Sequence, residues 1–94
     1  MEIYKHNYMV KLFKILANAN RVRVLELLLS AQTPLTVNEI AYELKVDQGN
    51  LSNHLKLMRK DGVLKAKQVS TKMYYSVKDG KVAEVMRAAG LAQT

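Results

Sequence analysis

The sequence predicts a mostly α-helical domain with one small β-hairpin, and two patterns predict it. Apolar residues recur at helical spacing in several segments before residue 61, and Val- and Tyr-rich alternation typical of strands follows between 65 and 77. The stretch from Thr36 to Val77 therefore holds a short helix, a tight turn, a polar-faced helix and a basic hairpin. This order is typical of a winged helix-turn-helix, which can place one helix in the major groove of DNA.

Length and charge narrow the classes of function. The 94 residues suit a single domain, 1–94, with one core. The formal net charge of +7 favours a polyanionic partner, with nucleic acid ahead of an anionic membrane. Cysteine is absent, which excludes disulfides and thiolate metal ligands. Met1–Asn7 lacks the apolar segment of a signal peptide, and the apolar runs are too short to span a bilayer. We expect a cytoplasmic protein.

Two helices are predicted before residue 32. The first runs from Ile3 to Ala19 and carries an unusually broad apolar stripe. Such a stripe indicates either a partner surface beside the core or one generously buried helix. Asn20 is predicted to cap the second helix, Arg21 to Ala31, which Thr33-Pro34 ends.

The next two helices form the predicted helix-turn-helix. After a brief strand at Leu35, Thr36 and Glu39 have the spacing of a capping box for the third helix. Asp47 is placed to cap the fourth helix, at about 48–61. The apolar seam of this helix recurs at i, i+4 and i+7 and consists of Leu51, Leu55 and Met58.

The opposite face of the fourth helix is small, polar and basic, with no acidic residue before Asp61. It consists of Gly49, Ser52, Asn53, Lys56 and Lys60. A solvated helix face usually mixes both signs of charge, so this bias is informative. Amide and hydroxyl groups can read base edges, and ammonium groups can bind phosphate. The face therefore has the chemistry of a groove-reading helix.

A hairpin wing is predicted at about 64–77, after Gly62 as a left-handed helix cap. Its arms are 65–69 and 73–77 and its tip is 70–72. The lysines of this hairpin suit phosphate contact; alternatively, they protect a solvated sheet edge. A last helix begins near Asp79, and its apolar face is expected to be exposed unless a second subunit covers it.

Several segments in this order resemble the ArsR/SmtB family of bacterial winged-helix transcriptional repressors. The opening motif of the family is similar to Leu12–Arg21, and its recognition helix is similar to Leu51–Arg59. Gly62–Leu64 and Tyr74–Val77 match the two ends of its wing. The resemblance covers roughly residues 12 to 79.

The resemblance implies a homodimer, joined through its first and last helices, that binds an inverted repeat in operator DNA. Two-fold dimers read half-sites about one helical turn apart. The interface residues expected on this basis are Tyr8, Leu12, Val82, Val85, Met86 and Ala89. The expected DNA-binding residues are Gln48, Gly49, Asn50, Ser52, Asn53, Lys56, Lys67, Gln68, Ser70, Thr71 and Lys72. On the same basis, Gln48, Gly49, Ser52 and Asn53 are expected to lie at bases or adjacent phosphates, and Lys56 and the wing residues mainly at the DNA backbone.

Departures from the family concern metal sensing. Thr36 and Asn38 stand where many members have a Cys-x-Cys pair, and hydroxyl and amide groups do not replace thiolates for soft metals. Lys81 stands where other members have a metal-binding His. We therefore predict no metal site and no cofactor. His54 is interpreted as a partly buried, hydrogen-bonded residue, with DNA contact as the alternative.

Other classes of function fit less well. No nucleophile–base arrangement or phosphate-binding loop is present, so we do not expect an enzyme. The alternative to a sequence-specific, homodimeric repressor is a winged helix used for protein contact or for non-specific DNA architecture. A small-molecule or protein effector is left open.

Overall fold

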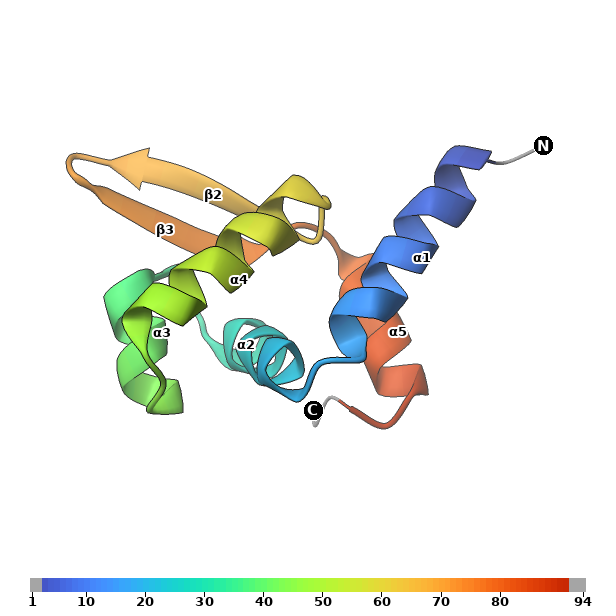
Figure 1. The fold of residues 1–94 in the computed structure, drawn as a ribbon, viewed down its shortest axis with the longest axis horizontal. Helices are drawn as coiled ribbons and strands as arrows, with labels where there is room; N and C mark the ends of the chain where they lie inside the picture. Colours follow the sequence, from blue (N-terminus) through green and yellow to red (C-terminus); the bar gives the residue numbers. More distant parts are fainter. Residues whose placement is uncertain (1–2, 92–94) are drawn as a thin grey trace.

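The computed structural model describes residues 3–91, with side chains described from Asn7 onward. Five helices and a small sheet follow one another in the described chain (Figure 1). Their order is α1 (Ile3–Leu16), α2 (Ala19–Ser30), β1 (Leu35–Thr36), α3 (Val37–Leu44), α4 (Gln48–Lys60), β2 (Leu64–Val69), β3 (Lys72–Val77) and α5 (Gly80–Ala88). This is the predicted winged helix-turn-helix. None of the described helices is both long and apolar enough to cross a membrane.

One apolar core joins the helices to the base of the wing. All five helices and both long strands contribute to it, although the side chains come from distant parts of the sequence. The side chains with no exposed surface are Leu12, Leu25, Ile40, Leu55, Met58, Val63, Val82 and Met86. Burial of each such side chain stabilises the fold by roughly 1.5–3 kcal/mol before conformational entropy is counted. The wing tip and the α1/α5 pair project from this core at opposite ends (Figure 1).

The break between the first two helices comes earlier in the sequence than predicted. α1 ends at Leu16, and α2 is capped by Asn18, not by Asn20. Asn18 is extended, and its side-chain oxygen accepts from the backbone N–H of Asn20 (3.0 Å) and Arg21 (3.2 Å). Both asparagines are suitable N-caps. The residue at which α1 ends decides which of the two caps α2.

The predicted capping box of α3 is confirmed. The hydroxyl of Thr36 accepts from the Glu39 N–H at 3.2 Å, and the Glu39 carboxylate accepts from the Thr36 N–H at 2.8 Å. The turn after α3 passes through Lys45, which is left-handed at φ 57°. The brief strand predicted at Leu35 is also present.

The sheet has three strands in the order β1-β3-β2, with both pairs antiparallel. β1 pairs with β3 through Leu35–Tyr75 and Thr36–Tyr74, a pairing that the sequence did not predict. The wing turn was predicted as three residues but has two, because Val69 pairs directly with Lys72. Ser70 takes a positive φ of 58°, as primed hairpin turns require at their first central position.

The expectation for the last helix needs correction. Val82 and Met86 have no exposed surface, because α5 packs them into the core of its own chain. Leu12 on α1 is equally buried. These three side chains therefore cannot touch a partner without rearrangement. Tyr8 and Val85 are partly exposed, and Ala89 is exposed.

Candidate nucleic-acid interface

Helix α4 is fixed at both ends and along one face. At its start, the Oδ2 of Asp47 accepts from the Asn50 N–H at 3.0 Å. Along the helix, the predicted seam of Leu51, Leu55 and Met58 is buried. At its end, the Val63 N–H donates to the Met58 carbonyl at 2.9 Å, with Gly62 at φ 80°. This end is a Schellman motif.

The face of α4 opposite the seam is open to solvent. Gly49, Asn53, Lys56 and Lys60 are exposed, and Ser52 is partly buried. No carboxylate lies on α4 itself, since its acidic neighbours Asp47 and Asp61 flank the helix. Gln48 and Asn50 are also exposed. The structure thus presents amides, one hydroxyl and ammonium groups along a single 13-residue helix.

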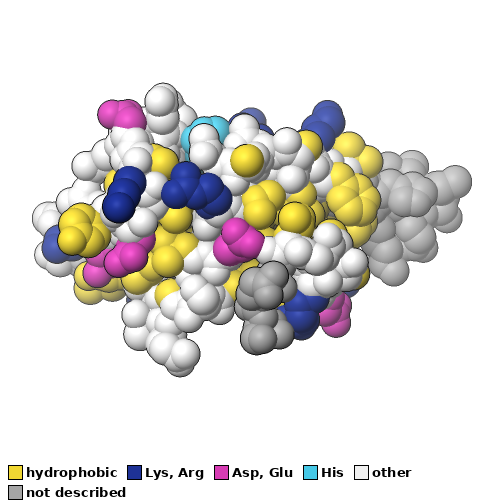
Figure 2. Space-filling model, turned by 90° about the horizontal axis from the view of Figure 1, so that it is seen from below, with side chains coloured by type: hydrophobic (Ala, Val, Ile, Leu, Met, Phe, Trp, Pro, Cys, Tyr) yellow, Lys and Arg dark blue, Asp and Glu magenta, His cyan; other side chains and the backbone are white. Residues whose placement is uncertain are grey.

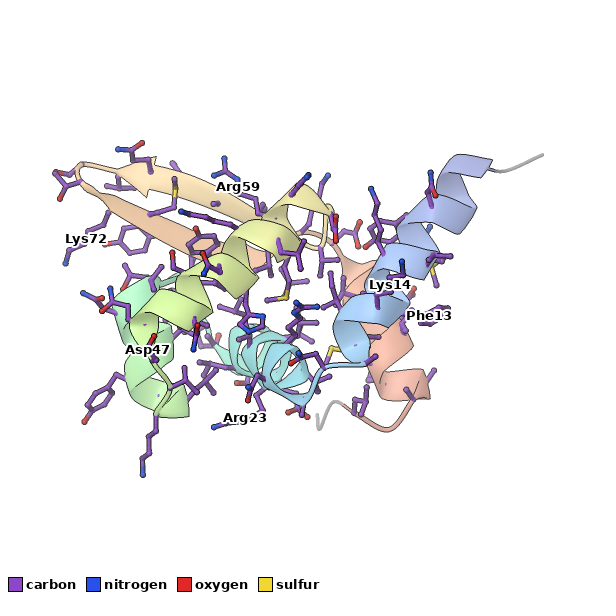
Figure 3. The ribbon with its side chains drawn as sticks, viewed as in Figure 1. Phe13, Lys14, Arg23, Asp47, Arg59 and Lys72 are labelled. Atoms are coloured by element: carbon purple, nitrogen blue, oxygen red, sulfur yellow. The ribbon has the colours of Figure 1, made fainter. Side chains whose placement is uncertain are left out.

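The wing brings a second set of polar groups to the same region. Lys67, Gln68, Ser70, Thr71 and Lys72 are all exposed. The Gln68 side chain donates to the Ser70 carbonyl at 3.2 Å, which ties the turn to β2. Lys72 lies at the start of β3, near the wing tip (Figure 3). The wing therefore presents cations and small donors at its outer end.

The sequence interpretation omitted a cation next to this set. Arg59 is exposed on α4 and lies on the side of the helix that faces the wing (Figure 3). On a wheel of about 100° per residue it falls beside Ser52, and this spacing was visible in the sequence. The side of α4 that faces the wing thus carries a positive charge that was not among the expected DNA-binding residues.

The other side of α4 faces α2. There His54 is partly buried, and its Nδ1 accepts from the Arg21 Nε at 2.9 Å. The interpretation of His54 as a hydrogen-bonded residue is confirmed. A second arginine, Arg23, donates to the Leu44 carbonyl at 2.8 Å and so joins α2 to the end of α3.

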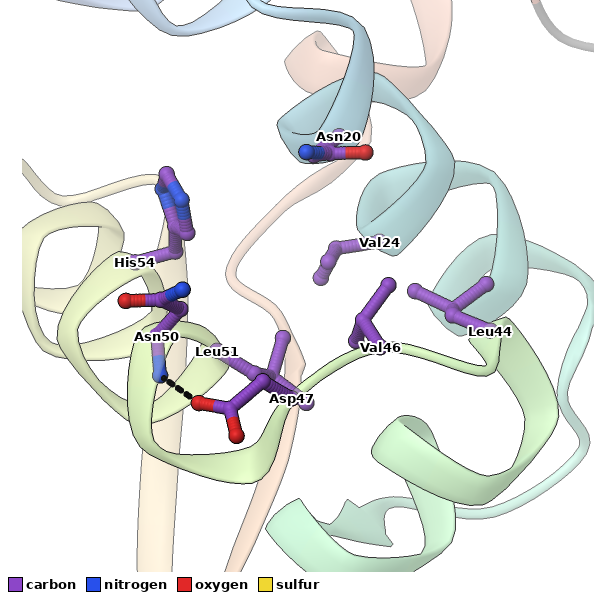
Figure 4. Close-up of a pocket in the computed structure, with 8 residues that line it drawn as sticks. All are labelled: Asn20, Val24, Leu44, Val46, Asp47, Asn50, Leu51 and His54. Atoms are coloured by element: carbon purple, nitrogen blue, oxygen red, sulfur yellow. Dashed lines mark hydrogen bonds between the residues drawn. The ribbon is translucent and has the colours of Figure 1, made fainter.

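A pocket of about 290 Å³ opens between α2, the α3–α4 turn and α4 (Figure 4). Its apolar wall consists of Val24, Leu44, Val46 and Leu51, and its polar wall of Asn20, Asp47, Asn50 and His54. The expected DNA-binding residue Asn50 therefore lies on the side of α4 towards α2, one helical turn before His54, and away from the centre of the exposed face.

The α1/α5 end of the molecule has a different character. Val10 and Phe13 on α1 are 50% and 55% exposed. Figure 2 shows hydrophobic side chains at the surface over much of one face of the molecule, including the part towards these helices. The Tyr8 hydroxyl is buried without a hydrogen-bond partner, although the rest of its side chain is partly exposed. Burial raises the pKa of Tyr8, and the nearby Asp79 carboxylate raises it further.

Among the described residues, no group of three or more His, Asp or Glu side chains lies close enough to hold an ion. The side chain of His6 lies outside the described part of the chain.

A capped helix with an amide- and lysine-rich face, beside a basic wing, defines a winged-helix DNA-binding protein. The model of the family "Bacterial regulatory protein, arsR family" matches residues 18–66, just over half of the chain. The chain therefore belongs to the arsR family. It is a DNA-binding transcriptional regulator and not an enzyme.

Individual relatives have the same character. An uncharacterised HTH-type transcriptional regulator of Methanocaldococcus jannaschii is 30% identical over 83 residues, 88% of this chain and 92% of that protein. HlyU from Vibrio cholerae is named a transcriptional activator. Its structure matches this chain with a TM-score of 0.80 at 28% identity, and the match spans 95% of this chain and 94% of the HlyU chain. The transcriptional repressor PagR of Bacillus anthracis has a TM-score of 0.81 at 28% identity, with coverage of 94% and 99%.

Proposed function

We propose that this regulator is a homodimeric repressor that binds an inverted repeat in operator DNA. The observation that carries the proposal is the exposed face of α4, which combines base-reading amides with lysines and has no carboxylate along its length. Asn53 lies at its centre, so its carboxamide can pair with a base edge. Lys56 and Lys60 then bind the flanking phosphates.

In this proposal the wing binds DNA backbone. Lys67 and Lys72 are exposed on β2 and β3 with polar neighbours at the turn. Backbone contacts fix the register of the protein on the duplex but carry no sequence information. Each phosphate contact adds about 0.9 to the slope of log affinity against log salt.

The dimer in this proposal forms through α1 and α5. Phe13 and Val10 are exposed apolar side chains on α1, Val85 lies on α5, and Ala89 is its C-terminal cap. Buried Leu12, Val82 and Met86 support these helices from within the chain. Two copies related by a two-fold axis present two α4 helices to successive major grooves. We place the regulator in the cytoplasm, together with its DNA.

The proposal is tested by comparing Asn53→Ala with Lys72→Ala on operator and mixed-sequence duplexes. Asn53→Ala should weaken operator binding much more than mixed-sequence binding, because it removes a base contact. Lys72→Ala should weaken both equally and reduce the salt slope by about 1. Equal losses on both duplexes for Asn53→Ala would exclude the base contact. A protein that retains neither duplex would favour a winged helix used for protein contact.

A further inference from the structure

The side of α4 that faces α2 carries a pair of side chains far apart in sequence. Arg21 and His54 are 33 residues apart, and the Arg21 Nε donates to the His54 Nδ1 at 2.9 Å. The imidazole of His54 is the acceptor in this hydrogen bond. The pair thus joins the first turn of α2 to the recognition helix.

Most of the Arg21 guanidinium is left unused by this bond. A guanidinium has five N–H donors in a planar fork, and the bond to His54 occupies one of them. Within the described part of the chain, the guanidinium makes no other hydrogen bond. Its remaining donors have the geometry that suits a phosphate.

The position of the pair suits a contact with the second DNA strand. Helix α4 lies between the wing and α2 (Figure 1), and it contacts β2 on the wing side. A helix in the major groove has a phosphate backbone on each side of it. The wing and Arg59 lie on the same side of α4 (Figure 3), which in the proposed complex is the side of one backbone. The side towards α2, with Arg21 and His54, then lies towards the other.

We infer that Arg21 is a further DNA-contacting residue, which binds the phosphate backbone on the α2 side of the recognition helix. His54 is the positioning residue that holds the guanidinium of Arg21 beside α4. This inference rests on the proposed function, because it assumes that α4 enters the groove.

The test measures binding of a mixed-sequence duplex by fluorescence anisotropy, so it does not depend on knowing an operator. The affinity of the unmodified protein is compared at pH 7.5 between 50 and 200 mM salt. Arg21→Gln removes the proposed phosphate contact. Its matched control is Arg23→Gln, which removes the same charge, and likewise one hydrogen bond, from an exposed position on α2 away from α4 (Figure 3). His54→Asn keeps an acceptor near the position of Nδ1.

Arg21→Gln should reduce the slope of log affinity against log salt by about 0.9. Between 50 and 200 mM salt, the loss of affinity of this variant should therefore be about 3.5-fold smaller than that of the unmodified protein. Arg23→Gln should leave the slope unchanged. His54→Asn should keep the slope of the unmodified protein, because it keeps an acceptor for the Arg21 guanidinium.

Two results would overturn the inference: an unchanged slope for Arg21→Gln, or a slope that falls equally in Arg23→Gln. An unmodified protein that binds no duplex at pH 7.5 would instead overturn the proposed function.

Discussion

Thr36, the residue that caps α3, is also the strand partner of Tyr74 in the wing. The hydroxyl of Thr36 accepts from the Glu39 N–H, while its backbone lies opposite β3. One residue therefore starts the helix-turn-helix and anchors the wing. The relative position of the two proposed DNA-binding elements depends on this junction.

Thr36→Val should lower the free energy of unfolding by about 1 kcal/mol, because it keeps the β-branched shape but removes the cap. Urea unfolding followed by circular dichroism measures this. Thr33→Val is the matched control, since Thr33 is exposed in the loop before β1. Equal effects of the two variants would show that the capping hydroxyl contributes nothing.

Gly62 ends α4 at a positive φ, and its replacement should be destabilising. Gly62→Ala should cost about 1 kcal/mol, because a Cβ disfavours φ 80°. An added Cβ would meet the Tyr8 Cε1 only at 3.9 Å, an ordinary contact, so the cost is conformational. Gly80→Ala, at the start of α5 with open space around it, should instead stabilise by up to about 1 kcal/mol. Thermal unfolding of the two variants should therefore shift in opposite directions, and shifts of the same sign would contradict this account.

Much of this architecture could be predicted because its signals are local. The capping box at Thr36, the Asp47 cap and the seam of α4 each depend on residues within one or two helical turns. The choice of Asn18 over Asn20 depends on where α1 leaves the core, which no local pattern specifies. The burial of Val82 and Met86 and the Arg21–His54 bond depend on how distant helices pack. Contacts of this kind are set by the tertiary structure and have no signature in the sequence.

Tyr8 should make stability depend on alkaline pH. Burial and Asp79 raise the pKa of Tyr8 in the folded chain above its ordinary value of 10.0. Its contribution is therefore fully present below pH 10 and is lost as pH rises through the folded pKa. Tyr8→Phe should remove this part of the alkaline loss. At pH 7 the same variant should not destabilise, because the hydroxyl has no partner.

The measurement for Tyr8 is the difference in unfolding free energy between the unmodified protein and Tyr8→Phe from pH 7 to 11. Taking the difference cancels the ionisation of the other tyrosines. A difference that does not change with pH would show that Tyr8 ionises equally in the folded and unfolded chains.

If the dimer forms through α1 and α5, a charge introduced at this end of the molecule should dissociate it. Phe13→Glu places a carboxylate on the proposed interface and should convert dimers to monomers in sedimentation velocity. Val69→Glu is the matched control, because Val69 is 50% exposed, similar to Phe13 at 55%, but lies in the wing. A dimer that survives Phe13→Glu, or that is lost equally with Val69→Glu, would contradict an interface through α1.

The central claim is that two copies of α4 read DNA sequence, and selection from a randomised duplex pool at near-physiological salt tests it most directly. Sequencing of the bound fraction should yield an inverted repeat with half-sites about one helical turn apart. Tight binding without any enriched sequence would contradict the claim and indicate an architectural DNA-binding protein.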